Sequence, residues 1–335
     1  MKILVMLALV SLAAAFSVAD TGTQKRGPAD APSRAVAVTV DDLPVVPPGD
    51  LRRQQEITRK LLAGIKAHGV PAVGFVNEGK LVQNGARREE SVALLRAWLD
   101  AGLELGNHTF SHNDLHTTPL EQFQQDVIRG EEVTRALLKE RGKTLRYFRH
   151  PFLHTGRDLE TKRKFEAFLA SRGYRVAPVT HDNSEWIFAR AYDNAGRRGD
   201  RQMMQRLGRE YVAYMERKFE YFERQSVMLF GYEMKQTLLI HANALNADYF
   251  GELARMMRRR GYKFITLDEA LTDKAYASPD TYAGPGGITW IHRWALTAGK
   301  RDDFFKGEPM TPDFVMKEAG QQNEYIVADK KESKN

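Results

Sequence analysis

Two histidines four residues apart, His108 and His112, have the spacing of a metal-binding pair. Residues four apart share one face of a helical turn, so we expect both imidazoles to reach a single divalent ion. The related H-E-x-x-H motif carries a glutamate base between its histidines. Here the intervening residues are a threonine, a phenylalanine and a serine, and none of them can act as a base. Acid–base chemistry therefore requires carboxylates and a further histidine from elsewhere in the chain.

Five more reactive residues follow predicted strands. Asp41 and Asp42 end the first strand, Arg149 follows the fourth, Asp182 the fifth and His241 the sixth. In parallel α/β folds the carboxyl ends of the strands form the functional edge of the sheet. We therefore expect these side chains to lie close to the histidine pair.

These residue types suggest a division of roles. Two histidines and one carboxylate make a three-ligand metal site with positions left for water and substrate. The side chains of adjacent Asp41 and Asp42 diverge, so one can bind the metal while the other accepts a proton. His241 can protonate a leaving group. Arg149 can hold a carboxylate in a bidentate pair, and Asp182 can orient His241 and keep it protonated.

Seven short apolar runs predict the strands that position these residues. They are residues 35–40, 72–76, 103–105, 145–148, 174–179, 237–240 and 263–266. Helical periodicity and helix-end signals fall between them, at about residues 57–65, 91–101, 118–141, 159–171, 201–224 and 248–260. The third of these helices begins with the pattern of a capping box at residues 118–121. Strands that alternate with helices indicate a parallel sheet, and seven units suggest a barrel smaller by one unit than the eight-fold kind. The same pattern also fits an open sheet.

Five segments carry these residues in order along the chain. They are Thr39-Val40-Asp41-Asp42, His108-Thr109-Phe110-Ser111-His112, Arg149-His150-Pro151, Asp182-Asn183-Ser184-Glu185-Trp186 and Leu239-Ile240-His241. Together they resemble the five motifs of polysaccharide deacetylases, the NodB-type carbohydrate esterase family. The resemblance extends from about Ala35 to Leu271. It implies an α/β fold, a distorted seven-unit β/α barrel.

The resemblance also implies roles for the metal end of the site. Asp41 would be the general base, and Arg149 would hold it in place. Asp42, His108 and His112 would bind the metal, usually zinc. Val40 stands where the family commonly has phenylalanine, which changes packing and not chemistry.

Further roles concern the substrate. The backbone N–H of Phe152 would help to bind the oxyanion, and Trp186 and Leu239 would wall the acetyl pocket. His241 would be the general acid, steadied by Asp182. The fourth motif usually ends in Asp-Trp, whereas this chain has Glu185 before the tryptophan. The role of Glu185 is therefore open, and it is the next candidate base after Asp41.

The amino-acid composition limits which side chains can bind a metal and which classes of binding partner are expected. The 335 residues include no cysteine, so any metal must use histidine and carboxylate ligands. Such sites accept zinc first, with cobalt, nickel or manganese as alternatives. The formal net charge of +7 suits an anionic surface, but clustered nucleic-acid motifs are missing, so no nucleic-acid partner is expected. The oligomeric state is not fixed by the sequence.

The ends of the chain have their own signals. Residues 1–19 have the basic, apolar and small-residue regions of a signal peptide, with cleavage near Ala19. We expect a flexible leader over 20–34, a catalytic domain over 35–275 and an irregular extension over 276–335 whose last dozen residues are disordered. The mature protein would be exported, periplasmic or extracellular, with no membrane span. Within the extension, Trp290, His292 and Trp294 either stack on sugars or pack in the core.

The sequence thus predicts a metal-dependent hydrolase that removes acetyl groups from an N- or O-acetylated glycan. Peptidoglycan, chitin-type oligomers and acetylated xylan all fit as substrates, and a basic exported chain favours a cell-envelope glycan. Two alternatives stay open. One is hydrolysis of another small amide on the same fold, and the other is a catalytically degenerate glycan-binding module.

Overall fold

The computed structural model of the protein describes residues 34–324. The expected signal peptide, nearly all of the leader and the final polar residues lie outside this range. The strand that was expected from residue 35 begins at Arg34. Within residues 34–324, none of the helices combines the length and apolar character needed to cross a bilayer.

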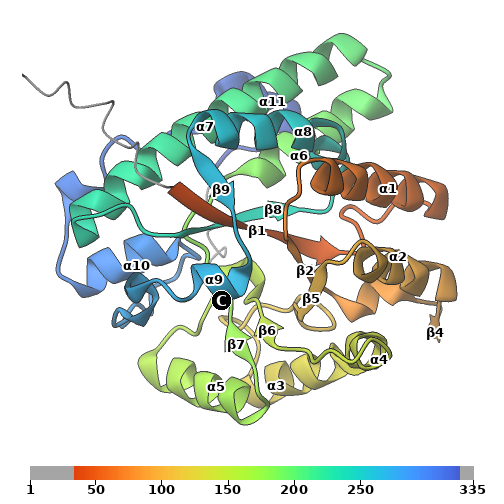
Figure 1. Cartoon of the computed structure of the whole chain (residues 1–335), viewed down its shortest axis with the longest axis horizontal. Helices are drawn as coiled ribbons and strands as arrows, with labels where there is room; N and C mark the ends of the chain where they lie inside the picture. Colours follow the sequence, from red (N-terminus) through yellow and green to blue (C-terminus); the bar gives the residue numbers. More distant parts are fainter. Residues whose placement is uncertain (1–33, 325–335) are drawn as a thin grey trace, which may run out of the picture. The chain divides into compact units, whose positions relative to one another are not determined.

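A curled sheet of seven parallel strands forms the centre of the fold (Figure 1). Its strands are β1 (Arg34–Leu43), β2 (Val73–Val76), β5 (Glu104–Asn107), β6 (Tyr147–Phe148), β7 (Arg175–Val176), β8 (Gln236–His241) and β9 (Tyr262–Phe264). Each corresponds to one of the seven predicted runs. The order across the sheet is β7-β6-β5-β2-β1-β8, and β9 pairs with the start of β1.

Strand β1 is the longest strand and pairs with three others, β2, β8 and β9. It pairs with β8 from Val36 to Asp41 and with β2 from Thr39 to Leu43. Its residues are buried on both faces, as expected for a parallel strand between helical layers. An isolated parallel bridge between His181 and Leu238 joins the segment after β7 to β8. The predicted distorted seven-unit β/α barrel is therefore confirmed.

Helices cover the outside of this sheet. They include α1 (Leu51–Ala67), α2 (Glu89–Asp100), α5 (Leu159–Ser171), α8 (Ala244–Arg259) and α9 (Leu267–Ala270). Asp50, Asp158 and Asn243 cap α1, α5 and α8 by accepting a hydrogen bond from the backbone N–H three residues later. Such a cap satisfies one of the free N–H groups in the first turn. The helices bury apolar faces against the strands in one large core.

The single helix predicted over 118–141 is wrong. The structure has two helices there, α3 (Leu120–Arg129) and α4 (Glu132–Lys139). Gly130 lies between them, and a Cβ at this position would come within 2.4 Å of the Thr109 backbone. The chain therefore needs glycine where it passes the histidine segment, and the helix breaks there. Pro119 precedes α3 without a side-chain cap, so the predicted capping box does not form.

The insertion after the fourth motif is helical. It consists of α6 (Glu185–Arg197) and α7 (Arg201–Phe230). The side chain of Asp200, the residue before α7, caps the N-terminus of that helix. The sequence predicted only the first part of α7 and did not predict α6. The remaining short elements are η1 (Glu78–Leu81), β3 (Val82–Gln83), β4 (Ala86–Arg87) and η2 (Pro151–Leu153).

The described part of the C-terminal extension contains short helices, which corrects in part the irregular structure expected after residue 275; residues 278–289 form neither helix nor strand. Its elements are η3 (Lys274–Ala277), α10 (Trp290–Thr297), η4 (Asp302–Phe305) and α11 (Asp313–Ala319). Trp290 and Trp294 are buried in an apolar cluster that includes Leu239 of β8. Of the two roles considered for these tryptophans, core packing is the one the structure has.

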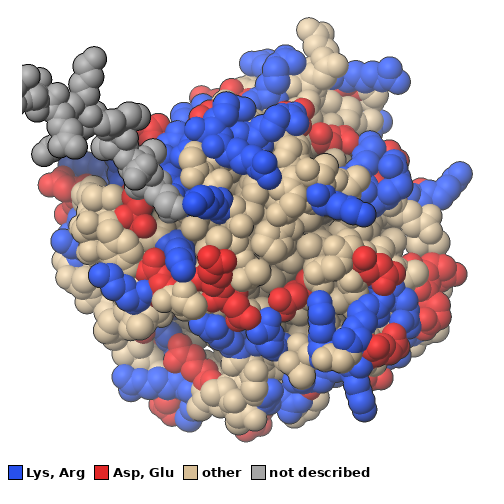
Figure 2. Space-filling view, in the orientation of Figure 1, with Lys and Arg blue, Asp and Glu red and all other residues tan. Residues whose placement is uncertain are grey.

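Charged side chains of both signs cover the face seen in Figure 2. Lys and Arg gather most densely over α7 and α8, and Asp and Glu are interspersed elsewhere. Some of the basic residues are paired: Arg260 lies 2.6 Å from Glu223, and Arg34 lies 2.6 Å from Glu233. Acidic partners thus neutralise some of the arginines on this basic surface.

Candidate active site

The two motif histidines lie in a loop and not on a helical turn, which corrects the prediction. His108 follows β5 directly, and the segment turns back through positive φ angles at Thr109 (65°) and His112 (56°). Side chains hold this turn: Asn107 accepts from the Thr109 N–H at 2.7 Å, and Thr109 accepts from the His112 N–H at 2.9 Å. The expected proximity of the imidazoles holds, because their ring centroids are 4.8 Å apart at an angle of 75°.

Both imidazoles face the carboxylate of Asp42. His112 Nε2 lies 3.6 Å and His108 Nε2 lies 4.0 Å from Asp42 Oδ1. The backbone carbonyl of Arg149 lies 2.8 Å from His108 Nδ1, which leaves Nε2 as the acceptor when Nδ1 carries the proton. One atom from each of the three residues lies within 4.8 Å of the others.

This donor set fits a divalent metal ion. Burial lowers the pKa of both His108 and His112, which favours the neutral imidazoles that bind metals. Burial alone would raise the pKa of Asp42, but Lys80 and the nearby histidines lower it below its usual range, so the carboxylate is ionised. Asp42 Oδ1 is buried, and its one close partner among the described residues is Lys80 Nζ at 3.2 Å, while neither imidazole is within hydrogen-bond distance of it. A bound cation would join this carboxylate to the two neutral imidazoles.

Lys80 is a site residue that the sequence analysis missed. Its Nζ donates to the Asp42 backbone carbonyl at 3.0 Å and lies 3.2 Å from Asp42 Oδ1. It comes from η1, just after β2, and belongs to none of the five motifs. Its position after a strand end was the available signal.

Asp41 lies beside the metal ligands and against a buried arginine. Arg149 is fully buried, with Nη1 3.4 Å from Asp41 Oδ2 and Nη2 donating to Thr39 Oγ1 at 2.8 Å. The predicted contact between Arg149 and Asp41 is present, but it is not the bidentate pair expected from the sequence, because Thr39 takes the second nitrogen. Burial raises the pKa of Asp41 to about 6, against the opposing effect of Arg149 and His241. A bound cation would lower this pKa.

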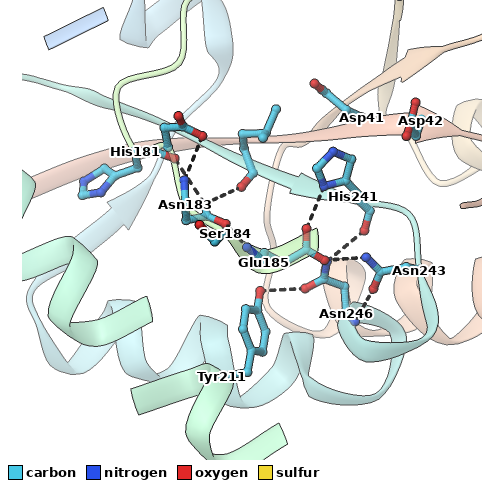
Figure 3. Close-up of polar contacts among 12 residues, drawn as sticks. Asp41, Asp42, His181, Asn183, Ser184, Glu185, Tyr211, His241, Asn243 and Asn246 are labelled. Carbon is cyan, nitrogen blue, oxygen red and sulfur yellow. Dashed lines mark hydrogen bonds and ion pairs between the residues drawn. The ribbon is translucent and has the colours of Figure 1, made fainter. Parts of the chain in front are cut away.

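His241 ends β8 and is held by Glu185 (Figure 3). Its Nδ1 lies 2.7 Å from Glu185 Oε2. The other Glu185 oxygen accepts hydrogen bonds from Asn243 and, at 2.8 Å, from Asn246. Tyr211 donates to Asn246 at 2.8 Å and fixes the outer part of this network. Although burial lowers the pKa of His241, the Glu185 carboxylate raises it to about 9.

Asp182 is not the residue that orients His241, which corrects the prediction. Its Oδ1 accepts from the Asn183 N–H at 2.8 Å, and among nearby charges Lys218 has the largest effect on its pKa, which it lowers. Burial raises the pKa of Asp182 to about 6. The reason is local: Asp182 lies in the loop before α6, while Glu185 is the first residue of that helix and points back to β8. The sequence alone does not show which of the two acids in this motif faces His241, because that depends on where α6 begins.

The expected acetyl-pocket residues line one cavity of about 410 Å³ together with the site. Phe152, Trp186 and Leu239 all contribute to its wall, as do the candidate metal ligands, Asp41 and His241. Phe152 has a positive φ of 56°, and its ring meets the His112 ring edge-on at 4.6 Å. The oxyanion role of its N–H and the acetyl-pocket roles of the other two residues stay predictions.

Part of the cavity wall comes from the C-terminal extension. Residues 286–289, His292, Glu308 and Glu324 line it, and Lys218 of α7 lies beside them. The boundary at residue 275 thus separates segments that build one cavity. No motif marked these residues, because their contribution depends on how the extension folds back.

Comparisons with known proteins agree with the motifs. Residues 29–168, which include the first three motifs, match the family model for polysaccharide deacetylase. A peptidoglycan-N-acetylglucosamine deacetylase from Bacillus cereus is 26% identical over 151 residues, which are 45% of this chain and 46% of that protein. The chain thus matches about half the length of this relative.

Solved structures include similar chains. The polysaccharide deacetylase Bc1974 from Bacillus cereus is 15% identical with a TM-score of 0.49, covering 70% of this chain and 91% of that one. A CE4 family pseudoenzyme from Bacillus anthracis is 14% identical with a TM-score of 0.44, covering 71% and 66% of the two chains. The resemblance to polysaccharide deacetylases drawn from the motifs is confirmed: residues 29–168 match the family model, and the Bacillus cereus deacetylase is similar over 151 residues.

Proposed function

We propose that the protein is a metal-dependent deacetylase of an N- or O-acetylated glycan. One observation carries the proposal: Asp42, His108 and His112 converge in a cavity that also holds a carboxylate able to accept a proton and an imidazolium able to donate one. Asp41 has a pKa of about 6 and His241 a pKa of about 9. Between these values Asp41 is ionised and His241 is protonated, which is the pairing that general base and acid catalysis needs.

Asp42, His108 and His112 would hold the metal. A divalent ion bound there supplies a Lewis acid that polarises the acetyl carbonyl and makes water a better nucleophile. Zinc suits two imidazoles and a carboxylate, and cobalt, nickel and manganese are alternatives.

The chain's own residues then divide the reaction. Asp41 accepts a proton from the attacking water, and Arg149 keeps its carboxylate in place. The Phe152 N–H donates to the oxyanion, and Trp186 and Leu239 enclose the acetyl methyl group.

His241 gives its proton to the departing amine or alcohol of the sugar. Glu185 replaces Asp182 in the proposed role of orienting His241. A carboxylate on Nδ1 leaves the proton on Nε2 free to be delivered.

The test is acetate release by the purified protein from peptidoglycan, chitin-type oligomers and acetylated xylan, with and without a chelator. We expect release from at least one glycan, loss on chelation and recovery on adding zinc. Release that persists in chelator would contradict metal dependence. No release from any of the glycans would favour another small amide as substrate, or a catalytically degenerate glycan-binding module.

Export is part of the same proposal, because a cell-envelope glycan lies outside the cytoplasm. It rests on Lys2, the apolar run that follows and the small residues at 17–19. N-terminal sequencing of protein recovered outside the cytoplasm should begin at or near Asp20. An intact Met1 on that protein would contradict cleavage.

A further inference from the structure

One side of the cavity is built by residues with no place in the reaction described above. They are Asp182, Lys218, His292, Glu308, Glu324 and the segment 286–289. They come from the loop before α6, from α7 and from the C-terminal extension, and they share the cavity with the candidate metal ligands. A substrate that places its acetyl group near those ligands would therefore extend toward this wall.

The extension is fastened to the barrel where it forms the wall. The Trp290 N–H donates to the Val179 carbonyl at 2.7 Å. Thr289 Oγ1 lies 3.1 Å and 3.0 Å from the carbonyls of Val179 and Thr180. Gly287 packs so closely on Phe152 that a Cβ there would lie 1.7 Å from the Phe152 carbonyl oxygen. The wall is thus a packed part of the fold and touches the residue proposed to bind the oxyanion.

The charged groups of the wall have hydrogen-bond donors and acceptors that their protein partners do not use. The Lys218 side chain is only 6% exposed, and its Nζ donates to Glu308 Oε1 at 2.5 Å. A lysine ammonium has three donors, so two remain for other acceptors. Asp182 Oδ1 is bonded to the Asn183 N–H, whereas Oδ2 accepts no hydrogen bond from the part of the chain that the structure describes. Glu324, by contrast, is occupied by Ser184 and Thr311.

The chemistry of these groups suits sugar hydroxyls. A carboxylate oxygen accepts from hydroxyl groups, and an ammonium donates to them, with stronger bonds than neutral partners make. The carboxylates of Asp182 and Glu308 outnumber the single ammonium of Lys218, so this side disfavours an anionic group. A cavity of about 410 Å³ lies within the range of roughly 300–1,000 Å³ that encloses one small ligand. The Lys218 side chain at this wall is only 6% exposed, so there is little open space behind it for a sugar chain to continue.

We propose that the wall of Asp182, Lys218, Glu308 and residues 286–289 is a subsite for the terminal sugar of an uncharged acetylated glycan. The protein would then act on short oligosaccharides and chain ends in preference to sugars within a polymer. This inference rests on the proposed deacetylase function and specifies its substrate.

The first test maps the position of deacetylation. Purified full-length protein with zinc is given chitin oligomers and acetylated xylan oligomers of two to six sugars, and the two polymers. Acetate is measured, and mass spectrometry locates the sugar that loses its acetyl group. We expect loss from one terminal sugar and slower release from polymers. Loss from internal sugars, or release from polymers only, would overturn the subsite while leaving the deacetylase function standing. Acetate release from peptidoglycan alone would also overturn the subsite for an uncharged glycan, whereas no acetate from peptidoglycan or from any of these substrates would overturn the function itself.

A second test uses variants of the wall. Removing a hydrogen bond to a charged group weakens binding by roughly 10- to 100-fold, so Asp182→Ala should raise KM for the oligomers by about that factor. The change in kcat should be much smaller, because among the described residues Asp182 forms no hydrogen bond or ion pair with the candidate metal ligands or with His241. A fall in kcat with KM unchanged would contradict a binding role.

Lys218→Met gives an independent reading with a matched control. Lys306 pairs with Asp303 at 2.5 Å on the same extension, but its side chain is 75% exposed. We expect Lys218→Met to raise KM and weaken the preference for terminal sugars, and Lys306→Met to change neither. Circular dichroism checks that each variant is folded. Equal behaviour of the two folded variants would contradict the subsite, and if Lys218→Met does not fold, the Asp182→Ala result decides.

Discussion

Among residues 34–324, two groups of one aspartate and two histidines bring their ligand atoms within 4.8 Å of one another. In the first, Asp42 with His108 and His112, the imidazole planes cross at 75°. In the second, Asp114 with His116 and His154, the rings are stacked at 3.8 Å with an angle of 8° between their planes. A metal ion lies near the plane of each imidazole that binds it. Crossing planes share such a position, whereas stacked planes do not.

The hydrogen bonds of the two groups differ in the same direction. His154 Nδ1 lies 2.7 Å from Asp114 Oδ1, so this carboxylate already has a partner. Asp42 Oδ1 pairs with Lys80 Nζ at 3.2 Å, but His112 Nε2 and His108 Nε2 lie 3.6 Å and 4.0 Å away and make no hydrogen bond to it. The imidazole nitrogens of the first group are therefore open to a cation, whereas the second group is closed by its own hydrogen bond between histidine and carboxylate. Residue types and proximity are the same in both, and orientation separates them.

The largest expected effect breaks the first group. His108→Ala should lose the bound metal and all measurable acetate release, because two remaining ligands hold a divalent ion weakly. His116→Ala is the matched control from the second group and should keep its metal. Elemental analysis of the purified variants measures both. Full zinc occupancy in His108→Ala, or loss of zinc in His116→Ala, would reverse the assignment.

A smaller effect should follow from removing the base while keeping the ligands. Asp41→Asn preserves size but cannot accept a proton, so activity should fall by roughly 10²- to 10⁴-fold with metal retained. Acetate release and metal content are measured on the same sample. Near-normal activity would place the base elsewhere.

The acid can be tested through the leaving group. His241→Ala should slow amide substrates much more than activated esters, because a good leaving group departs without a proton. Rates on an acetylated amino sugar and on an aryl acetate give the comparison. Equal losses on both would mean that His241 is not the acid.

The smallest change is a shift in pH dependence. The base must be ionised and the acid protonated, so kcat/KM should rise with pH through the pKa of Asp41 and fall through that of His241, at about 9. Glu185 raises the His241 pKa, so Glu185→Gln should move the falling limb to lower pH. Asp182→Asn should leave that limb in place. A shift in Asp182→Asn and none in Glu185→Gln would restore the original assignment.

The sequence was sufficient where periodicity and strand ends decide the outcome. All seven strands formed where apolar runs were bounded by turn signals, and Asp41, Asp42, Arg149 and His241 came together because parallel strands share one functional edge. The contact of His108 with His112 was predicted for the wrong reason. A helical turn and this loop both bring residues four apart together, and spacing does not distinguish them.

Other features depend on tertiary contacts that local patterns do not encode. The break at Gly130 follows from the backbone of Thr109 passing against it. The choice of Glu185 over Asp182 follows from where α6 begins. The extension after residue 275 reads as irregular because its short helices become stable only when Trp290 and Trp294 are buried on the barrel.

The most direct test is a zinc titration of metal-stripped protein with acetate release measured at each step. We expect activity to rise linearly and to level off at one ion per chain, since of the two groups in residues 34–324 the first is the one with crossing imidazole planes. Activity that is already present before zinc is added, or that needs a second ion, would contradict a single site at Asp42, His108 and His112.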